Sequence, residues 1–152
     1  MKFRIDRGSA ESVRLPRLLQ EPHLDPRPSY NLVVEDAKGF SGWAGIDRIQ
    51  GTDSGQFGWY LRSDGWGRGY ATEATRLLLD FGFSVLHRAT MWATADPDNL
   101  ASLRVLEKSG LTRQGLTSPA HTWRGTSPRV LFTMEAEQWR TRFRSPGPSE
   151  GC

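Results

Sequence analysis

The chain has 152 residues, of which 37% are hydrophobic and 24% charged, and it carries a formal net charge of +3. This length suits one domain with a real core, and this composition is that of a globular chain rather than a disordered one. No stretch approaches the roughly 18 apolar residues of a membrane span, and the first residues lack the apolar run of a signal peptide. Cys152 is the single cysteine, which excludes an intramolecular disulfide and a thiolate zinc site. We therefore expect a cytoplasmic protein without a membrane partner.

The 20 basic residues are scattered along the chain, and the one dense run is Arg140, Arg142 and Arg144. This scatter argues against a nucleic-acid partner, although the high isoelectric point alone is typical of one. The six tryptophans fall mostly in predicted strands, where packing in the core is the simpler explanation. The basic character equally suits an anionic small ligand such as a nucleotide phosphate.

Hydrophobic periodicity predicts an alternation of strands and helices along most of the chain. Strands are expected over 2–6, 30–36, 40–49, 57–63, 88–95, 111–117 and 129–136, and helices over 9–20, 72–83 and 99–110. This order predicts an α+β (mixed α/β) fold with a single central, mostly antiparallel twisted sheet and helices packed on both faces. We expect a short N-terminal segment (1–29), one domain (30–139) and a basic, disordered tail (140–152).

Two glycines, Gly67 and Gly69, directly precede the helix predicted over 72–83. Glycines in this position let phosphate oxygens approach the unpaired amides of a helix N-terminus. A tight strand-to-helix turn explains the same residues, and the stretch alone does not separate the two readings. The dinucleotide motif GxGxxG and the Walker motif GxxxxGK[ST] are both absent from the sequence.

Two blocks in the chain, "WGRGYA" (66–71) and "ADPDNLASLRVLEKSGL" (95–111), carry a family resemblance. The first is similar to the pyrophosphate motif [RQ]xxGx[GA] of the GNAT superfamily of acyl-CoA-dependent N-acetyltransferases, with Trp66 at the usual Arg or Gln position. The second resembles the "PxNxxSxxxLEKxGF" helix of the branch that acetylates ribosomal-protein N-terminal amines. The resemblance covers residues 30–139, and two spaced blocks in the right order are more specific than a lone glycine motif.

The resemblance implies transfer of an acetyl group from acetyl-CoA to a primary amine, either a protein N-terminus or a small molecule. It also implies contacts with acetyl-CoA from a set of residues in the two blocks and the strand before them: Leu61, Arg62, Ser63, Trp66, Gly67, Arg68, Gly69, Tyr70, Ala71, Thr72 and Asn99. Ser102 is the implied catalytic hydroxyl, with an inert helix serine as the alternative. Asn99 is equally explained as a helix N-cap.

Two positions depart from the family pattern. Leu106 replaces the tyrosine that acts as the general acid in many members, and Gln56 stands where glutamate is common. Because glutamine accepts no proton at neutral pH, two alternatives are open: a base acting through water (Glu35, Asp47 or His121), or reaction with an amine that is already neutral. The segment 1–29 is short for the wall of an acceptor site. Three explanations are open: a site open to a protein N-terminus, a wall supplied by a second copy in a homodimer, or lost catalysis. The alternative function is therefore a catalytically impaired acyl-CoA-binding or regulatory domain.

Overall fold

The computed structural model describes residues 2–6, 29–49, 51–63, 66–67, 69–117 and 127–143. Its strands are β1 (Lys2–Asp6), β2 (Ser29–Asp36), β3 (Gly39–Arg48), β4 (Ser54–Leu61), β5 (Thr90–Ala95), β6 (Thr112–Leu116) and β7 (Val130–Glu135). Its helices are α2 (Tyr70–Asp80), the π-helical turn η3 (Phe81–Val85), α3 (Leu100–Lys108) and α4 (Ala136–Phe143). Among the described residues, no helix is both long and apolar enough to cross a bilayer.

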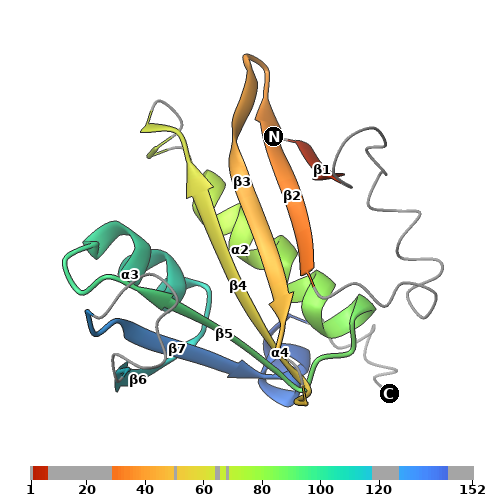
Figure 1. Cartoon of the computed structure of the whole chain (residues 1–152), viewed down its shortest axis with the longest axis vertical. Helices are drawn as coiled ribbons and strands as arrows, with labels where there is room; N and C mark the ends of the chain where they lie inside the picture. The colour runs from red at the N-terminus through yellow and green to blue at the C-terminus, as the bar shows by residue number, and fades with distance from the viewer. Residues whose placement is uncertain are drawn as a thin grey trace, which may run out of the picture.

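All seven strands belong to one sheet, in the order β1-β2-β3-β4-β5-β7-β6 (Figure 1). Neighbouring strands are antiparallel except β4 and β5, which run parallel. The parallel pair is short, because it joins Ser54 with Thr90, Gly55 with Met91, and Gln56 with Trp92, and then ends. Beyond this junction the two strands diverge, as Figure 1 shows plainly. The mixed, mostly antiparallel sheet that the sequence predicts is confirmed.

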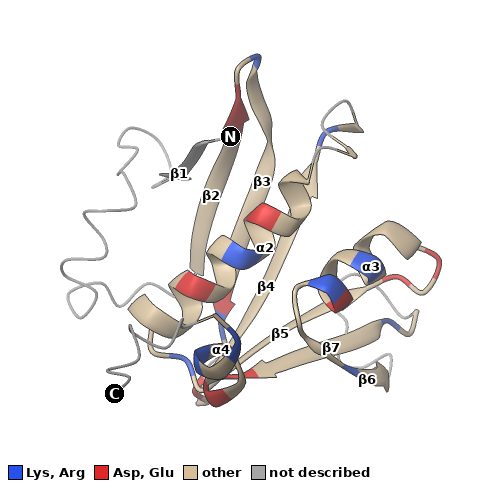
Figure 2. Cartoon of the chain, turned by 180° about the vertical axis from the view of Figure 1, so that it is seen from behind, with Lys and Arg blue, Asp and Glu red and all other residues tan. Residues whose placement is uncertain are grey.

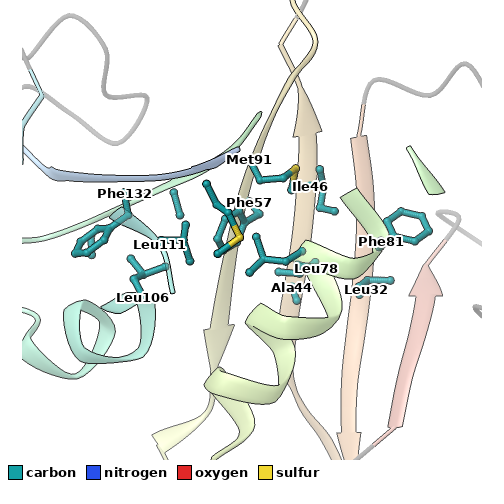
Figure 3. Close-up of a cluster of buried hydrophobic side chains, with 14 of the residues drawn as sticks. Leu32, Ala44, Ile46, Phe57, Leu78, Phe81, Met91, Leu106, Leu111 and Phe132 are labelled. Atoms are coloured by element: carbon teal, nitrogen blue, oxygen red, sulfur yellow. The ribbon is translucent and has the colours of Figure 1, made fainter. Parts of the chain in front are cut away.

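The core lies between one face of this sheet and the helices α2 and α3. Alternate residues of a strand point to one face, so Ala44 and Ile46 of β3 lie on the same side as Phe57 of β4. Leu78 of α2 and Leu106 of α3 pack against that side in one continuous cluster (Figure 3). The described helices therefore cover a single face. Helices on both faces remain a prediction, because the helix expected over 9–20 lies outside the described residues.

The helix predicted over 72–83 is present as α2 and η3, and Figure 2 shows acidic and basic residues at intervals along α2. The change to π-helical hydrogen bonding was not predicted. It coincides with a close contact, because a Cβ on Gly82 would lie 2.5 Å from the Met91 sulfur. A π-helical segment of this kind usually occurs as a single turn within an α-helix.

The terminal helix α4 corrects one prediction, since it includes residues 140–143, which the sequence placed in a disordered tail. Two contacts of Trp139 anchor this helix. Its indole N–H donates to the Asp80 carboxylate at 3.0 Å, and its ring stacks on Phe83 with the ring centroids 5.5 Å apart. The residues after 143 lie outside the described part of the chain, and the domain boundaries stay predictions.

Candidate functional site

A cleft opens where β4 and β5 diverge, beyond the last paired residues Gln56 and Trp92. The cavity there has a volume of about 270 Å³. Its lining comes from β2, β3, β4, β5, α3 and the residue before β7. The lining residues include Asn31, Trp43, Gly45, Asp47, Gln56, Phe57, Gly58, Trp59, Tyr60, Thr94, Asn99, Ser102, Leu106 and Arg129. Parts of the chain that are far apart in sequence therefore meet at the point where the sheet splits.

One stripe of α3 faces this cleft. Asn99, Ser102 and Leu106 are spaced by three and four residues, which places them on one side of a helix, and all three line the cavity. The structure thus brings together the predicted catalytic Ser102 and the predicted cofactor contact Asn99. Leu106 is buried one helical turn from Ser102 and offers no proton.

Asn99 is the N-cap of α3, because its side-chain oxygen accepts a hydrogen bond from the Ser102 amide at 3.1 Å. We expect Asn99→Ala to lower the free energy of unfolding by about 1 kcal/mol, since the amide loses its partner. Asn99→Asp is the matched control, because aspartate caps equally well and should leave stability within about 0.5 kcal/mol. Urea unfolding measures both, and equal stability of Asn99→Ala and the wild type would contradict the capping role.

The end of β4 is tied to its surroundings by three hydrogen bonds. The Arg62 amide donates to the Ser41 carbonyl at 2.8 Å, on the β3 side of the strand. The Trp66 indole donates to the Leu61 carbonyl at 3.0 Å, and the Trp66 amide donates to the Ser63 carbonyl at 3.2 Å. The Arg62 amide is therefore already used by β3, and a contact of Arg62 with the cofactor stays a prediction for its other atoms.

The open edge of β4 lies earlier in the strand. Backbone groups alternate between the two sides of a strand, and Arg62 faces β3. Phe57, Trp59 and Leu61 therefore face the opposite side, where β5 has already diverged. Such an edge presents N–H and C=O groups that an extended ligand can pair with. Of the three residues predicted for this role, Leu61 is the one whose amide faces the gap.

The turn before α2 needs its two glycines for their backbone conformation. Gly67 has φ +78° and Gly69 has φ +77°, a left-handed conformation that costs other residues roughly 1–2 kcal/mol. A Cβ built on either would meet nothing within 4 Å among the described residues. The space in front of the turn is thus open to a ligand. The intervening Arg68 lies outside the described residues.

The first amides of α2 have no partner within the helix itself. Glu73 is the first residue to bond back, from its amide to the Gly69 carbonyl at 3.0 Å. The amides of residues 70–72 precede this bond, which leaves them for an external acceptor. Together with the helix dipole they favour an anion at this end of the cleft. The predicted contact of Tyr70, Ala71 and Thr72 with the cofactor stays a prediction.

Of the two candidate bases that the structure describes, Glu35 and Asp47, only Asp47 lines the cavity. Burial raises the pKa of the Asp47 carboxyl above its usual value, because desolvation disfavours the charged form. Glu35 pairs with Phe40 near the β2–β3 turn and is not among the lining residues. His121 lies outside the described residues. Asp47 is also the cross-strand partner of Gln56, so a carboxylate sits one strand away from the position where the family usually has glutamate.

The lining residues that sequence reasoning missed include Asn31, Tyr60 and Arg129. Arg129 precedes β7, and its guanidinium donates to the Thr94 hydroxyl at 2.9 Å and to the Thr94 carbonyl at 3.2 Å. No motif signals these residues, because they reach the cleft through strand order. The expectation that the tryptophans pack in the core was wrong for Trp43 and Trp66, which are 44% and 69% exposed.

The chain is similar to known proteins both in sequence and in structure. The sequence profile of a family described as "Acetyltransferase (GNAT) domain" matches residues 9–112. The uncharacterized N-acetyltransferase p20 of Bacillus licheniformis is 28% identical over 88 residues, which are 57% of this chain and 49% of that protein. The chain spans about half the length of the curated relatives it matches.

Solved structures share the fold at low sequence identity. RimJ of Mycobacterium smegmatis, solved in complex with CoA-disulfide, has a TM-score of 0.64 and 22% identity, over 75% of this chain and 60% of that one. A chimera of the Vibrio cholerae spermidine N-acetyltransferase SpeG with hSSAT has a TM-score of 0.68 and 16% identity, over 91% and 99%. At this identity the likeness supports the architecture and leaves the substrate open.

Proposed function

Because this chain belongs to the GNAT acetyltransferase family, we propose that it transfers the acetyl group of acetyl-CoA to a primary amine. The observation that carries this proposal is the divergence of β4 from β5 after Gln56, with the N-terminus of α2 following the far end of β4. Acetyltransferases of this fold use acetyl-CoA. The cleft therefore offers an open strand edge for the extended arm of acetyl-CoA and a helix N-terminus for its diphosphate.

The residues fit the donor at both ends of the cleft. The amides of residues 70–72 and the open space at Gly67 and Gly69 suit the diphosphate. The unpaired edge at Phe57 and Trp59 suits the pantetheine arm, which carries amides of its own and pairs as an extra strand does. This places the thioester near Asn99 and Ser102 of α3.

In the proposed chemistry, the nitrogen of the neutral amine attacks the thioester carbonyl, a C–N bond forms, and the C–S bond breaks. An α-amine has a pKa of about 7.7–8.0, so a group that takes up its proton aids the attack. We assign proton removal to Asp47, directly or through water. We assign to the Ser102 hydroxyl on α3 the return of a proton, relayed from water, to the departing thiolate, whose basicity is modest.

Two measurements test the proposal on the intact chain. Calorimetry with acetyl-CoA is expected to give binding near micromolar concentrations, and release of free thiol with a panel of primary amines is expected to exceed the rate without enzyme. Absence of acetyl-CoA binding would overturn the proposal.

The second candidate function is a non-catalytic acyl-CoA-binding or regulatory domain. It is favoured by buried Leu106 in place of a tyrosine and by Gln56 in place of a glutamate. This candidate predicts acetyl-CoA binding without thiol release for any amine, so the same pair of measurements separates it from the enzyme.

A further inference from the structure

The cavity extends onto the face of the sheet opposite α2 and α3. Three cross-strand pairs of β3 and β4 line the cavity on this face: Trp43 with Tyr60, Gly45 with Gly58, and Asp47 with Gln56. Ala44 and Ile46 between them point the other way, into the core. We name these six residues the glycine trough, after the glycine pair at its middle.

The floor of the glycine trough is open at Gly58, where no atom of the described residues lies within 4 Å of the position a Cβ would take. At Gly45 the floor is covered, because a Cβ there would lie 3.1 Å from the Tyr30 carbonyl oxygen and 3.2 Å from the side-chain oxygen of Asn31. A flat group can therefore lie directly on the sheet at Gly58, with the Asn31 oxygen beside it as a hydrogen-bond acceptor.

One end of the glycine trough is aromatic and exposed. Tyr60 is 63% exposed and Trp43 is 44% exposed, although both line the cavity. Phe40 packs edge-on against Trp43 with the ring centroids 5.2 Å apart, which holds the indole in place. Large aromatic groups held in water at the mouth of a cavity are suited to stack on a ligand ring.

The opposite end carries the carboxylate of Asp47. Among the described residues that line the cavity, Asp47 is the one acid and Arg129 the one base. Arg129 is held at the β5 side by its two bonds to Thr94. A site with one carboxylate complements one ammonium group, whereas a polyamine requires several carboxylates to neutralise its charges.

We propose that the glycine trough is the acceptor site, and that the acceptor is a monoamine with an aromatic group close to its amino group. The inference rests on the proposed function. Neighbouring cross-strand pairs of the glycine trough are about 6.7 Å apart along the strands. An amine above the glycine pair at the middle therefore reaches both Asp47 and the aromatic end. Gly58 lies between Phe57 and Trp59, whose backbone edge faces the proposed donor. An N-terminal aromatic residue and an arylalkylamine share this chemistry.

The test compares matched amines with acetyl-CoA as the donor. We expect phenylalaninamide to exceed glycinamide in kcat/KM by about tenfold, because its ring reaches Trp43 and Tyr60. Spermidine should be no better than glycinamide. Phenethylamine and a peptide that begins with phenylalanine distinguish the two sources of the aromatic amine. Equal kcat/KM for phenylalaninamide and glycinamide would overturn the proposal.

Variants locate the preference in the glycine trough. Tyr60→Ala and Trp43→Ala should each reduce the preference for phenylalaninamide to within about threefold, mainly through KM, because stacking is lost. Leu116→Ala, which removes a 66% exposed side chain from β6, is the matched control and should keep the full preference.

Asp47→Asn should raise KM for both amines, whereas Asp53→Asn in the β3–β4 turn should not. Thermal melting identifies any variant that fails to fold.

Different outcomes test the proposed function and the glycine trough. A wild-type protein that does not bind acetyl-CoA overturns the proposed function. Where transfer is too slow to measure, calorimetry with CoA present compares the binding of phenylalaninamide and glycinamide directly. Tighter binding of phenylalaninamide, abolished by Tyr60→Ala, supports the glycine trough; equal binding overturns it.

Discussion

Gly69→Glu is expected to weaken acetyl-CoA binding by at least about 100-fold, or about 2.7 kcal/mol. The position directly precedes the amides of residues 70–72, and the space in front of it is open. A glutamate there places a carboxylate beside the proposed diphosphate, where like charges at close range repel. Because salt screens such repulsion, part of the lost affinity should return at high ionic strength. Calorimetry at two salt concentrations measures both effects.

Two variants separate charge from backbone strain in this prediction. Gly69→Ala imposes the same strain at φ +77° without the charge, and should lose far less affinity than Gly69→Glu. Gly51→Glu adds the same side chain at φ +76° in the turn before β4, at the other end of that strand, and should bind acetyl-CoA normally. If Gly69→Ala binds as poorly as Gly69→Glu, the glycine turn acts through its shape; if Gly69→Glu binds normally, the phosphate assignment is wrong.

Phe132→Ala is expected to lower the free energy of unfolding by about 3–5 kcal/mol. Phe132 lies on β7 with no exposed surface, and packs in the cluster with Leu106 and Leu111 (Figure 3). Truncation removes buried apolar area and leaves a cavity that the flanking strands β5 and β6 close only partly. Urea unfolding at constant m-value measures the change.

Leu116→Ala is the matched control for Phe132→Ala. Its side chain lies on the neighbouring strand β6 and is 66% exposed, so its loss should change stability by no more than about 0.5 kcal/mol. A loss below about 1 kcal/mol for Phe132→Ala would contradict its place at the centre of the core.

Local patterns predicted the strands and the two main helices because those elements are set by neighbours in sequence. Ala74 and Leu78 recur at helical spacing and are buried in α2, as expected. Tyr30, Leu32 and Val34 alternate along β2 and face the helices. The N-cap role of Asn99 was predicted for the same reason, since the cap acts within its own helix.

The features that were missed depend on contacts between distant segments. Helix α4 is short and polar, and its described anchors, Asp80 and Phe83, lie on other elements, so its own sequence gives little signal. The pairing of Asp47 with Gln56 depends on strand register, which composition does not fix. The same holds for Arg62, because only the register of β3 shows that its amide is already bonded.

The short junction at which β4 meets β5 also has a thermodynamic consequence. Paired residues Ser54–Gln56 and Thr90–Trp92 carry the backbone bonds between the two parts of the sheet. A donor bound in the gap as proposed would add further bonds across it, and would bind the native chain but not the unfolded one. At a donor concentration 100 times its Kd, the free energy of unfolding would rise by about 2.7 kcal/mol. The lifetime of the protein against proteases would then follow the supply of acetyl-CoA in the cell.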